Sequence, residues 1–208
     1  ATLLAYTFIN GRRDGDLFEF EGVKENVADA RLIGWYKCYG SRYGDQNLSL
    51  ADMKQRCNGD KVMYACRPTG AANWTVLGQG LRNEVFINTG DGNNRVTRSN
   101  GIDWYLSNDW SMGMAAAGTG VSRNRCDVRG EPQRNQRICW HTENSRMMGG
   151  FRCGARTGLN EADDWERAVF TNRLTAGGGD VYFSCKEAFE NGQEQSGVYD
   201  IMPPGASE

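Results

Sequence analysis

Seven cysteines are the side chains of this 208-residue chain whose type and spacing most directly imply chemistry. They fall into two groups of three and one single residue: Cys38, Cys57 and Cys66, then Cys126, Cys139 and Cys153, and finally Cys185. A zinc site usually contains two close Cys-X-X-Cys pairs or several histidines, whereas these spacings are long and the chain has one histidine. The pattern therefore favours disulfide bonds, which form in oxidising compartments.

The number of cysteines in each group limits how they can pair. Both groups of three are odd, so pairing all six requires at least one bridge between the groups. We therefore expect residues 38 to 153 to form one folded unit. Fifteen pairings of six cysteines exist, and the spacing does not select among them. Cys185 can be free, paired to another chain, or paired into the main domain.

One segment combines aromatic rings with polar side chains, as carbohydrate-binding surfaces do. It runs from Asp103 to Trp110, and aromatic rings of this kind stack on a sugar while Asp and Asn bond its hydroxyls. Strand alternation places Trp104 and Leu106 on one face, where they can equally be core residues. We expect Tyr105 and Trp110 to be the exposed pair. The candidate ligand-binding residues are Asp103, Tyr105, Asn108, Asp109 and Trp110.

Groups that could catalyse a reaction are few. His141 lies in an apolar, cysteine-flanked stretch without a Gly-X-Ser-X-Gly motif, and we interpret it as a hydrogen-bonded core histidine. Glycoside hydrolysis needs two carboxylates at a defined separation, which sequence does not supply. The candidates for such a pair are Asp103, Asp109, Asp127, Asp163, Asp164 and Glu166. We predict no catalytic residue and no enzyme activity.

Calcium is the one cofactor that the sequence makes possible. Asp91 and Asn93 lie in a turn rich in oxygen-bearing side chains, although the turn lacks the spaced acidic pattern of an EF-hand loop. A plain Asx-rich hairpin turn explains the same residues.

Two Asn-X-Ser/Thr sequons begin at Asn47 and Asn73, and they are candidate N-glycosylation sites, although chance can also produce them. The sequence begins at Ala1 without a charged and apolar leader, as a secreted protein does after signal-peptide removal. These features, together with the cysteines, predict a secreted, extracellular glycoprotein.

Net charge argues against nucleic acid as a partner, and the length of the apolar stretches argues against a membrane span. The formal net charge is −2, which does not provide the basic face that nucleic acid requires. No apolar stretch approaches the ~20 residues needed to span a bilayer. The 24 basic residues are mostly arginine, which predicts a guanidinium-rich surface, or ordinary salt bridges with the 26 acidic residues.

Short apolar runs separated by Gly, Asn and Asp predict many strands joined by tight turns. The expected strands are 3–9, 32–39, 61–66, 74–77, 84–87, 102–106, 111–115, 137–141, 166–171 and 181–184. Ser49 and Asp52 predict a capped helix that ends at a left-handed Gly59, and residues 184–191 predict a second. The fold class is therefore all-β: a disulfide-stapled antiparallel β sandwich or barrel with one or two short helices.

The C-terminal segment 185–203 resembles the opening of a fibrinogen-related domain. The matching residues are Cys185, Glu187, Gly192, Ser196, Gly197, Val198, Tyr199, Ile201 and Pro203. The sequence ends at Glu208, before the body that holds that family's calcium and ligand sites, so no functional residue carries over. The resemblance implies an extracellular context, often lectin-like, adhesive or defensive. It divides the chain into a secreted cysteine-containing β domain (1–180) and a fibrinogen-like tail (181–208).

These features predict an extracellular recognition module, carbohydrate-binding or adhesive, whose partner is a glycan or an extracellular glycoprotein. One alternative is a structural subunit of a matrix or filament, with a homo-oligomeric interface or Cys185 contacting a neighbour. A second alternative is a polysaccharide hydrolase. The first needs an exposed aromatic platform, the second a self-complementary interface, and the third two carboxylates facing a cleft.

Overall fold

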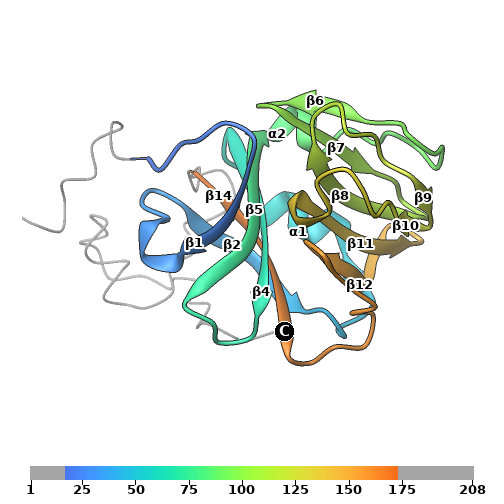
Figure 1. Cartoon of the computed structure of the whole chain (residues 1–208). Coiled ribbons are helices and arrows are strands. Elements are labelled where there is room, and N and C mark those ends of the chain that lie inside the picture. The colour runs from blue at the N-terminus through green and yellow to red at the C-terminus, as the bar shows by residue number, and fades with distance from the viewer. Residues whose placement is uncertain (1–16, 173–208) are drawn as a thin grey trace, which may run out of the picture.

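The computed structural model describes residues 17–172, which form two antiparallel β-sheets packed face to face (Figure 1). The first sheet contains β1 (Val23–Ala28), β2 (Tyr36–Arg42), β4 (Lys61–Pro68), β5 (Asn73–Leu81) and β14 (Trp165–Thr171). The second contains β3 (Leu48–Ser49), β6 (Thr97–Ser99), β7 (Ile102–Leu106), β8 (Ser111–Ala116), β11 (Arg137–Glu143), β12 (Arg146–Cys153) and β13 (Arg156–Thr157). A separate two-stranded pair is formed by β9 (Arg123–Asn124) and β10 (Cys126–Asp127).

The strand orders show how distant segments meet. The first sheet follows β1-β5-β4-β14-β2, and the second follows β13-β12-β11-β8-β7-β6 with β3 paired to β12. Hairpins such as β4–β5 and β7–β8 need short connections only, whereas β14 lies between β4 and β2 although it follows all the strands of the second sheet in the sequence. The predicted disulfide-stapled antiparallel β sandwich is confirmed.

The helices are short, as predicted, but one of them ends differently. They are α1 (Leu50–Arg56), α2 (Arg82–Val85) and two 3-10 turns, η1 (Asp29–Arg31) and η2 (Arg134–Gln136). The Ser49 Oγ accepts a hydrogen bond from the Asp52 amide at 3.2 Å, which confirms the predicted cap of α1. The predicted left-handed Gly59 is wrong, because that residue does not have a positive φ. The helix instead closes where the Cys57 amide bonds the Met53 carbonyl.

The strand predicted at residues 84–87 is also wrong, because α2 covers the first two of these residues and ends at the C-cap Phe86. Its single turn closes when the Phe86 amide bonds the Arg82 carbonyl at 3.1 Å. The Arg82 side chain donates to the carbonyls of Lys54 and Cys57, both at 2.7 Å, and so ties α2 to the end of α1. An apolar run of three residues, 85–87, is too short to distinguish a strand from a helical turn.

The observed boundaries of β2 differ from the predicted ones. The predicted 32–39 strand begins four residues late, at Tyr36, because Leu32 and Trp35 belong to a turn whose side chains cover the first sheet. Two long strands, β1 and β12, were not predicted. β12 contains Gly149 and Gly150, which interrupt the apolar pattern by which a strand is recognised in a sequence. A Cβ on Gly150 would lie 2.1 Å from the Tyr43 ring, so packing requires glycine at this position.

The main core lies between the two sheets. Tyr64 of β4 packs against Trp104 of β7 and Trp140 of β11, with ring centroids 5.1 and 5.0 Å apart. Trp104 and Leu106 both belong to this core, so the interpretation of these two residues as core is confirmed. Alternation along β4 turns Met63 to the opposite face, where a second apolar cluster covers the first sheet.

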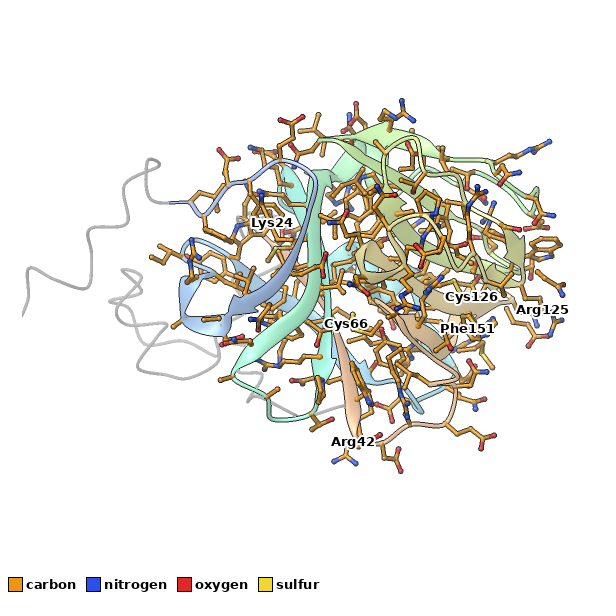
Figure 2. All side chains as sticks on the ribbon, in the orientation of Figure 1. Lys24, Arg42, Cys66, Arg125, Cys126 and Phe151 are labelled. Carbon is orange, nitrogen blue, oxygen red and sulfur yellow. A yellow bond between two sulfur atoms is a disulfide. The ribbon has the colours of Figure 1, made fainter. Side chains whose placement is uncertain are left out.

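Three disulfides join separate elements of the described residues, across sequence separations from 13 to 87 residues. Cys66–Cys153 links β4 to β12 and therefore the two sheets, which confirms the bridge expected between the two cysteine groups. Cys38–Cys57 ties β2 to the end of α1, and Cys126–Cys139 ties β10 to β11. Figure 2 shows Cys66 near the middle of the molecule and Cys126 toward the outer edge of the second sheet.

Four arginines are buried among the residues that the structure describes, so these guanidinium groups are not part of a surface. They are Arg123, Arg137, Arg152 and Arg167. The first three lie over the outer face of the second sheet, where Arg137 Nη1 bonds the buried Asp127 carboxylate at 2.6 Å. Burial lowers the pKa of Arg167 to about 10, and its guanidinium donates to the carbonyls of Met148 and Asp45.

Several predictions fall outside residues 17–172: the strands at 3–9 and 181–184, the second helix, Cys185 and the fibrinogen-like tail. Within the described residues, no helix is both long enough and apolar enough to cross a bilayer.

Candidate functional site

A hollow of about 240 Å³ lies at the end of β11 that contains His141 and Glu143. Its lining combines one indole, one imidazole, two side-chain amides and three charged groups: Gln46, Trp110, Arg125, His141, Glu143, Asn160 and Glu161. These residues come from five separate segments of the chain. We call this space the Trp110 hollow.

Trp110 is held by the turn between β7 and β8. The Ser107 Oγ accepts hydrogen bonds from the amides of Asp109 and Trp110, each at 3.1 Å, and the Trp110 carbonyl accepts one from the Thr142 amide at 3.0 Å. These bonds fix the backbone on both sides of the indole. The side chain is half-buried and lines the hollow, as expected for a ring that can stack on a ligand.

His141 is the hydrogen-bonding centre of the Trp110 hollow. Its imidazole bonds to the Asn160 side chain and to the Trp110 backbone, and its ring lies 6.1 Å from that of Phe151. Burial, followed by the positive charge of Arg125, lowers the pKa of His141 below its usual value. The imidazole is therefore neutral at pH 7. The predicted hydrogen bonding is confirmed, but the residue is half-buried beside the hollow, outside the main core.

Arg125 reaches the hollow from the short β9–β10 pair. It has a positive φ of 69°, which turns the chain sharply between the two strands, and its side chain is exposed. The Cys126–Cys139 bridge holds this turn against β11, close to His141. Figure 2 shows Arg125 at the outer edge of the molecule, beside Cys126 and Phe151 and far from Lys24.

Tyr105 does not belong to this site, and its predicted exposure is wrong. Its side chain is only 1 % exposed, its hydroxyl donates to the Ile138 carbonyl at 2.9 Å, and Arg123 lies 5.0 Å from the ring centroid. Burial raises the pKa of this hydroxyl well above its usual value. Tyr105 faces away from the main core as alternation requires, but loops cover that face of the sheet.

The remaining residues of the predicted segment have different roles. Asp103 is buried, and its carboxylate accepts hydrogen bonds from Arg98 Nε and from the Gly118 amide, both at 2.8 Å. Asp109 is exposed and accepts from the Asn144 amide at 2.9 Å, while Asn108 is half-buried in the same turn. None of these three is in the lining of the Trp110 hollow.

The candidate calcium turn is organised by a guanidinium. Arg123 Nη2 donates to the carbonyls of Gly90 and Gly92, at 3.0 and 2.6 Å, and the Asp91 carboxylate accepts a hydrogen bond from the Ser107 hydroxyl. Asn93 is exposed on the same turn. Across residues 17–172, no cluster of three or more His, Cys, Asp or Glu side chains could hold a metal ion. Calcium binding stays a prediction.

The two sequons differ in their surroundings. Asn47 is exposed with a left-handed φ of 66°, and it follows Gln46, which lines the Trp110 hollow. Asn73 begins β5, is half-buried, and donates through Nδ2 to the Asn26 side chain at 2.8 Å. Asn47 is therefore the more accessible acceptor, and glycosylation of either residue stays a prediction.

The carboxylates that line the Trp110 hollow were not among the predicted ones. Glu143 ends β11 and Glu161 lies in the loop between β13 and β14. Of the six predicted carboxylates, Asp103 and Asp127 are buried in hydrogen bonds elsewhere, and none of the six is in the lining. No local motif marks Gln46, Arg125, Asn160 or these two glutamates, because only the sheet brings their segments together.

Comparison of the chain with protein-family models, with curated proteins and with solved structures finds no match.

Proposed function

We propose that residues 17–172 form an extracellular recognition module that binds carbohydrate in the Trp110 hollow. The observation that carries this proposal is the convergence of Trp110, His141 and Asn160 on one small surface hollow. An indole supplies a stacking face, and the imidazole and amide supply directed hydrogen bonds to hydroxyls. At about 240 Å³ the hollow is smaller than the ~300–1,000 Å³ of typical small-molecule sites, which suits one or two sugar rings.

The charges of the hollow favour a neutral sugar or an amino sugar. Glu143 and Glu161 supply two negative charges and Arg125 one positive charge, while His141 is neutral at pH 7. The lining therefore has one excess negative charge, which repels a polysulfated chain and accepts hydroxyl and amino donors.

The proposed partner is a glycan or an extracellular glycoprotein, and the proposed location is outside the cell. Three disulfides within the described residues are compatible with an oxidising compartment. The exposure of Asn47 is compatible with N-glycosylation. We propose binding without catalysis, and calcium as a possible addition to be tested together with the ligand.

The experiment is a glycan-array screen of the oxidised protein, with and without calcium, followed by titration of the best ligand. We expect Trp110→Ala to weaken binding at least tenfold while changing the melting temperature by no more than a few degrees, because the side chain is half-buried and the turn is held by backbone bonds. Asp109→Asn is the matched control in the same turn, and it should bind normally. Equal affinity for wild type and Trp110→Ala would overturn the assignment of this hollow.

A second candidate, a polysaccharide hydrolase, is favoured by one observation: two carboxylates, Glu143 and Glu161, line the same hollow. The array ligand should then be cleaved by the wild type. Glu143→Gln and Glu161→Gln should abolish cleavage while retaining binding. If the ligand stays intact over long incubation, the binding function stands alone.

The assembly alternative is tested by the mass of the protein in solution. If no glycan on the array binds and the mass in solution is well above that of one chain, an assembly function replaces the recognition proposal.

A further inference from the structure

Both ring nitrogens of His141 are engaged at the Trp110 hollow. The imidazole bonds to the Trp110 backbone and to the Asn160 side chain. Each ring nitrogen has one in-plane hydrogen or one lone pair, so the two partners occupy different nitrogens. The Trp110 amide already donates to the Ser107 Oγ at 3.1 Å, so the carbonyl is the backbone group left for the imidazole. A carbonyl only accepts, and the imidazole is therefore the donor in this bond.

The second ring nitrogen decides how the Asn160 amide is oriented. The neutral imidazole uses its single N–H on the Trp110 carbonyl, so its other nitrogen accepts, and Asn160 donates to it through Nδ2. The Asn160 Oδ1 then lies on the other side of the amide, as an acceptor for a ligand in the hollow. When His141 gains a proton, both ring nitrogens become donors, and the amide must turn its oxygen toward the ring. Proton uptake therefore replaces an acceptor of the hollow by a donor.

The backbone around Asn160 is fixed, so only its side chain can respond. The Leu159 amide donates to the Phe151 carbonyl at 3.1 Å, and the Ala162 amide donates to the Leu159 carbonyl at 2.9 Å. The segment also packs closely on β12, because a Cβ on Gly149 would lie 2.3 Å from the Asn160 carbonyl oxygen. Rotation of the amide about its side-chain torsion is the change that this packing leaves possible.

The charges around His141 oppose a proton on its ring. Arg125, from the β9–β10 turn, and Arg167, from β14, both act on the imidazole as positive charges. Glu143 on β11 and Glu161 in the loop between β13 and β14 also line the hollow. Within residues 17–172, however, neither carboxylate forms an ion pair with the imidazole. The remaining lining side chains are uncharged: Gln46, Trp110, Thr142, Met148 and Asn160.

We propose that the proton on His141 controls carbohydrate binding in the Trp110 hollow: the neutral imidazole admits a neutral glycan, and the protonated imidazole releases it. This inference rests on the proposed function. A sugar that covers the hollow removes water from the imidazole, which costs far more for the cation than for the neutral ring. The turned Asn160 amide also no longer accepts from the hydroxyl that it bound at neutral pH. Such a site holds its ligand at neutral pH and releases it in an acidic environment.

The first measurement is an NMR titration of the oxidised protein over pH, without ligand. The chain has one histidine, so a single set of imidazole signals reports its protonation. We expect the ring to gain a proton below about pH 6.5, and the Asn160 side-chain amide to shift with the same midpoint. Asn160→Asp should raise this midpoint by about 1 pH unit, because it brings a carboxylate to the ring. An Asn160 amide that does not follow the imidazole, or a ring still neutral at about pH 4.5, would overturn the proposal.

The second measurement is the affinity for the tightest-binding neutral glycan of the array, at about pH 7.5 and at one pH unit below the His141 midpoint. Roughly nine-tenths of the imidazole is protonated at the lower pH, so the wild-type affinity should fall about tenfold. His141→Gln cannot titrate, and its affinity should be nearly equal at the two pH values. Any fall that remains in this variant belongs to Glu143 and Glu161. Asp109→Asn, outside the lining, is the matched control and should keep the wild-type ratio.

The outcomes separate this inference from the proposed function. A glycan affinity that is independent of pH, or that falls equally in His141→Gln, would overturn the inference and leave the carbohydrate assignment standing. Absence of binding by every neutral glycan at both pH values would overturn both. If His141→Gln does not fold, the glycan-saturated wild type decides, because linkage requires a lower imidazole midpoint in the complex than in the free protein. An unchanged midpoint would overturn the inference.

Discussion

The outer faces of the two sheets are covered by different chemistry. Over the first sheet, Trp74 and Phe170 pack edge to face with centroids 5.3 Å apart, and Trp35 completes an apolar cluster. Over the second sheet lie the buried guanidinium groups of Arg123, Arg137 and Arg152, with Asp127 as the buried carboxylate among them. The first face is covered by hydrophobic burial, whereas the second combines a smaller apolar cluster around Tyr105 and Val121 with hydrogen bonds from these cations.

The difference follows from the segment that covers each sheet. Residues 117–136, over the second sheet, form little regular structure, so their carbonyls need donors from side chains. Arg137 donates to the carbonyls of Gly120 and Pro132, and Arg152 to those of Asp127 and Arg129. A guanidinium has five donors in a fixed plane and can hold several loop carbonyls at once. The Trp110 hollow, through Arg125, is built on this hydrogen-bonded cover.

The largest effect should come from the disulfide that joins the two sheets. We expect Cys66→Ala with Cys153→Ala to lower the free energy of unfolding by about 4 to 5 kcal/mol, since the bridge closes a sequence separation of 87 residues. Loss of Cys126–Cys139, with a separation of 13, should cost about 3 kcal/mol. Urea denaturation of the two double variants measures both values. Unchanged midpoints in both would contradict the stapling role of these bridges.

The next largest effect should be on the arginine-covered face. Asp127→Ala leaves Arg137 buried without its carboxylate, and we expect a loss of about 3 kcal/mol in the free energy of unfolding. The control is Arg134→Ala, because Arg134 is exposed where it pairs with Glu131, so its loss should cost about 0 to 1 kcal/mol. If both variants lose the same small amount, the buried ion pair does not support this face.

A smaller effect on stability, with no effect on binding, should come from a substitution in the apolar cluster over the first sheet. Phe170→Leu nearly conserves volume within the cluster over the first sheet, and we expect a loss of about 1 kcal/mol in the free energy of unfolding. Binding in the Trp110 hollow should be unchanged, because no residue of this cluster lines it. Thermal melting and ligand titration test the two parts of this expectation. Weaker binding in Phe170→Leu would mean that the two faces are coupled.

The smallest effect should be a pH dependence from His141. Its pKa is lowered in the folded protein, so the unfolded chain binds more protons below the ordinary value of about 6.5. Its contribution to stability is therefore fully present above pH 6.5 and is lost as the pH falls below it. Denaturation at a series of pH values should show a decline that is shallower in His141→Gln. An identical pH profile in that variant would show that His141 does not cause the decline.

Local patterns were informative where a short segment decides its own structure. The alternation of β7 assigned Trp104 and Leu106 to the core, and the Ser49 cap marked the start of α1. The same logic failed at Tyr105, because alternation tells which side of a sheet a residue faces and not whether another segment covers that side. The strand prediction for residues 84–87 was wrong for a related reason, since so short a run does not define its own structure and Arg82 ties the segment to the end of α1.

By itself the sequence determined the all-β class, the presence of disulfides, and a bridge between the two cysteine groups, since composition, parity and turn residues are local or countable properties. Only the tertiary structure decided which cysteines pair, which arginines are buried, and which polar residues meet at the Trp110 hollow. Sheet order brings Gln46, Arg125, His141 and Asn160 together from distant segments. Strand pairing and loop packing bring these residues together, and their spacing along the chain does not predict it.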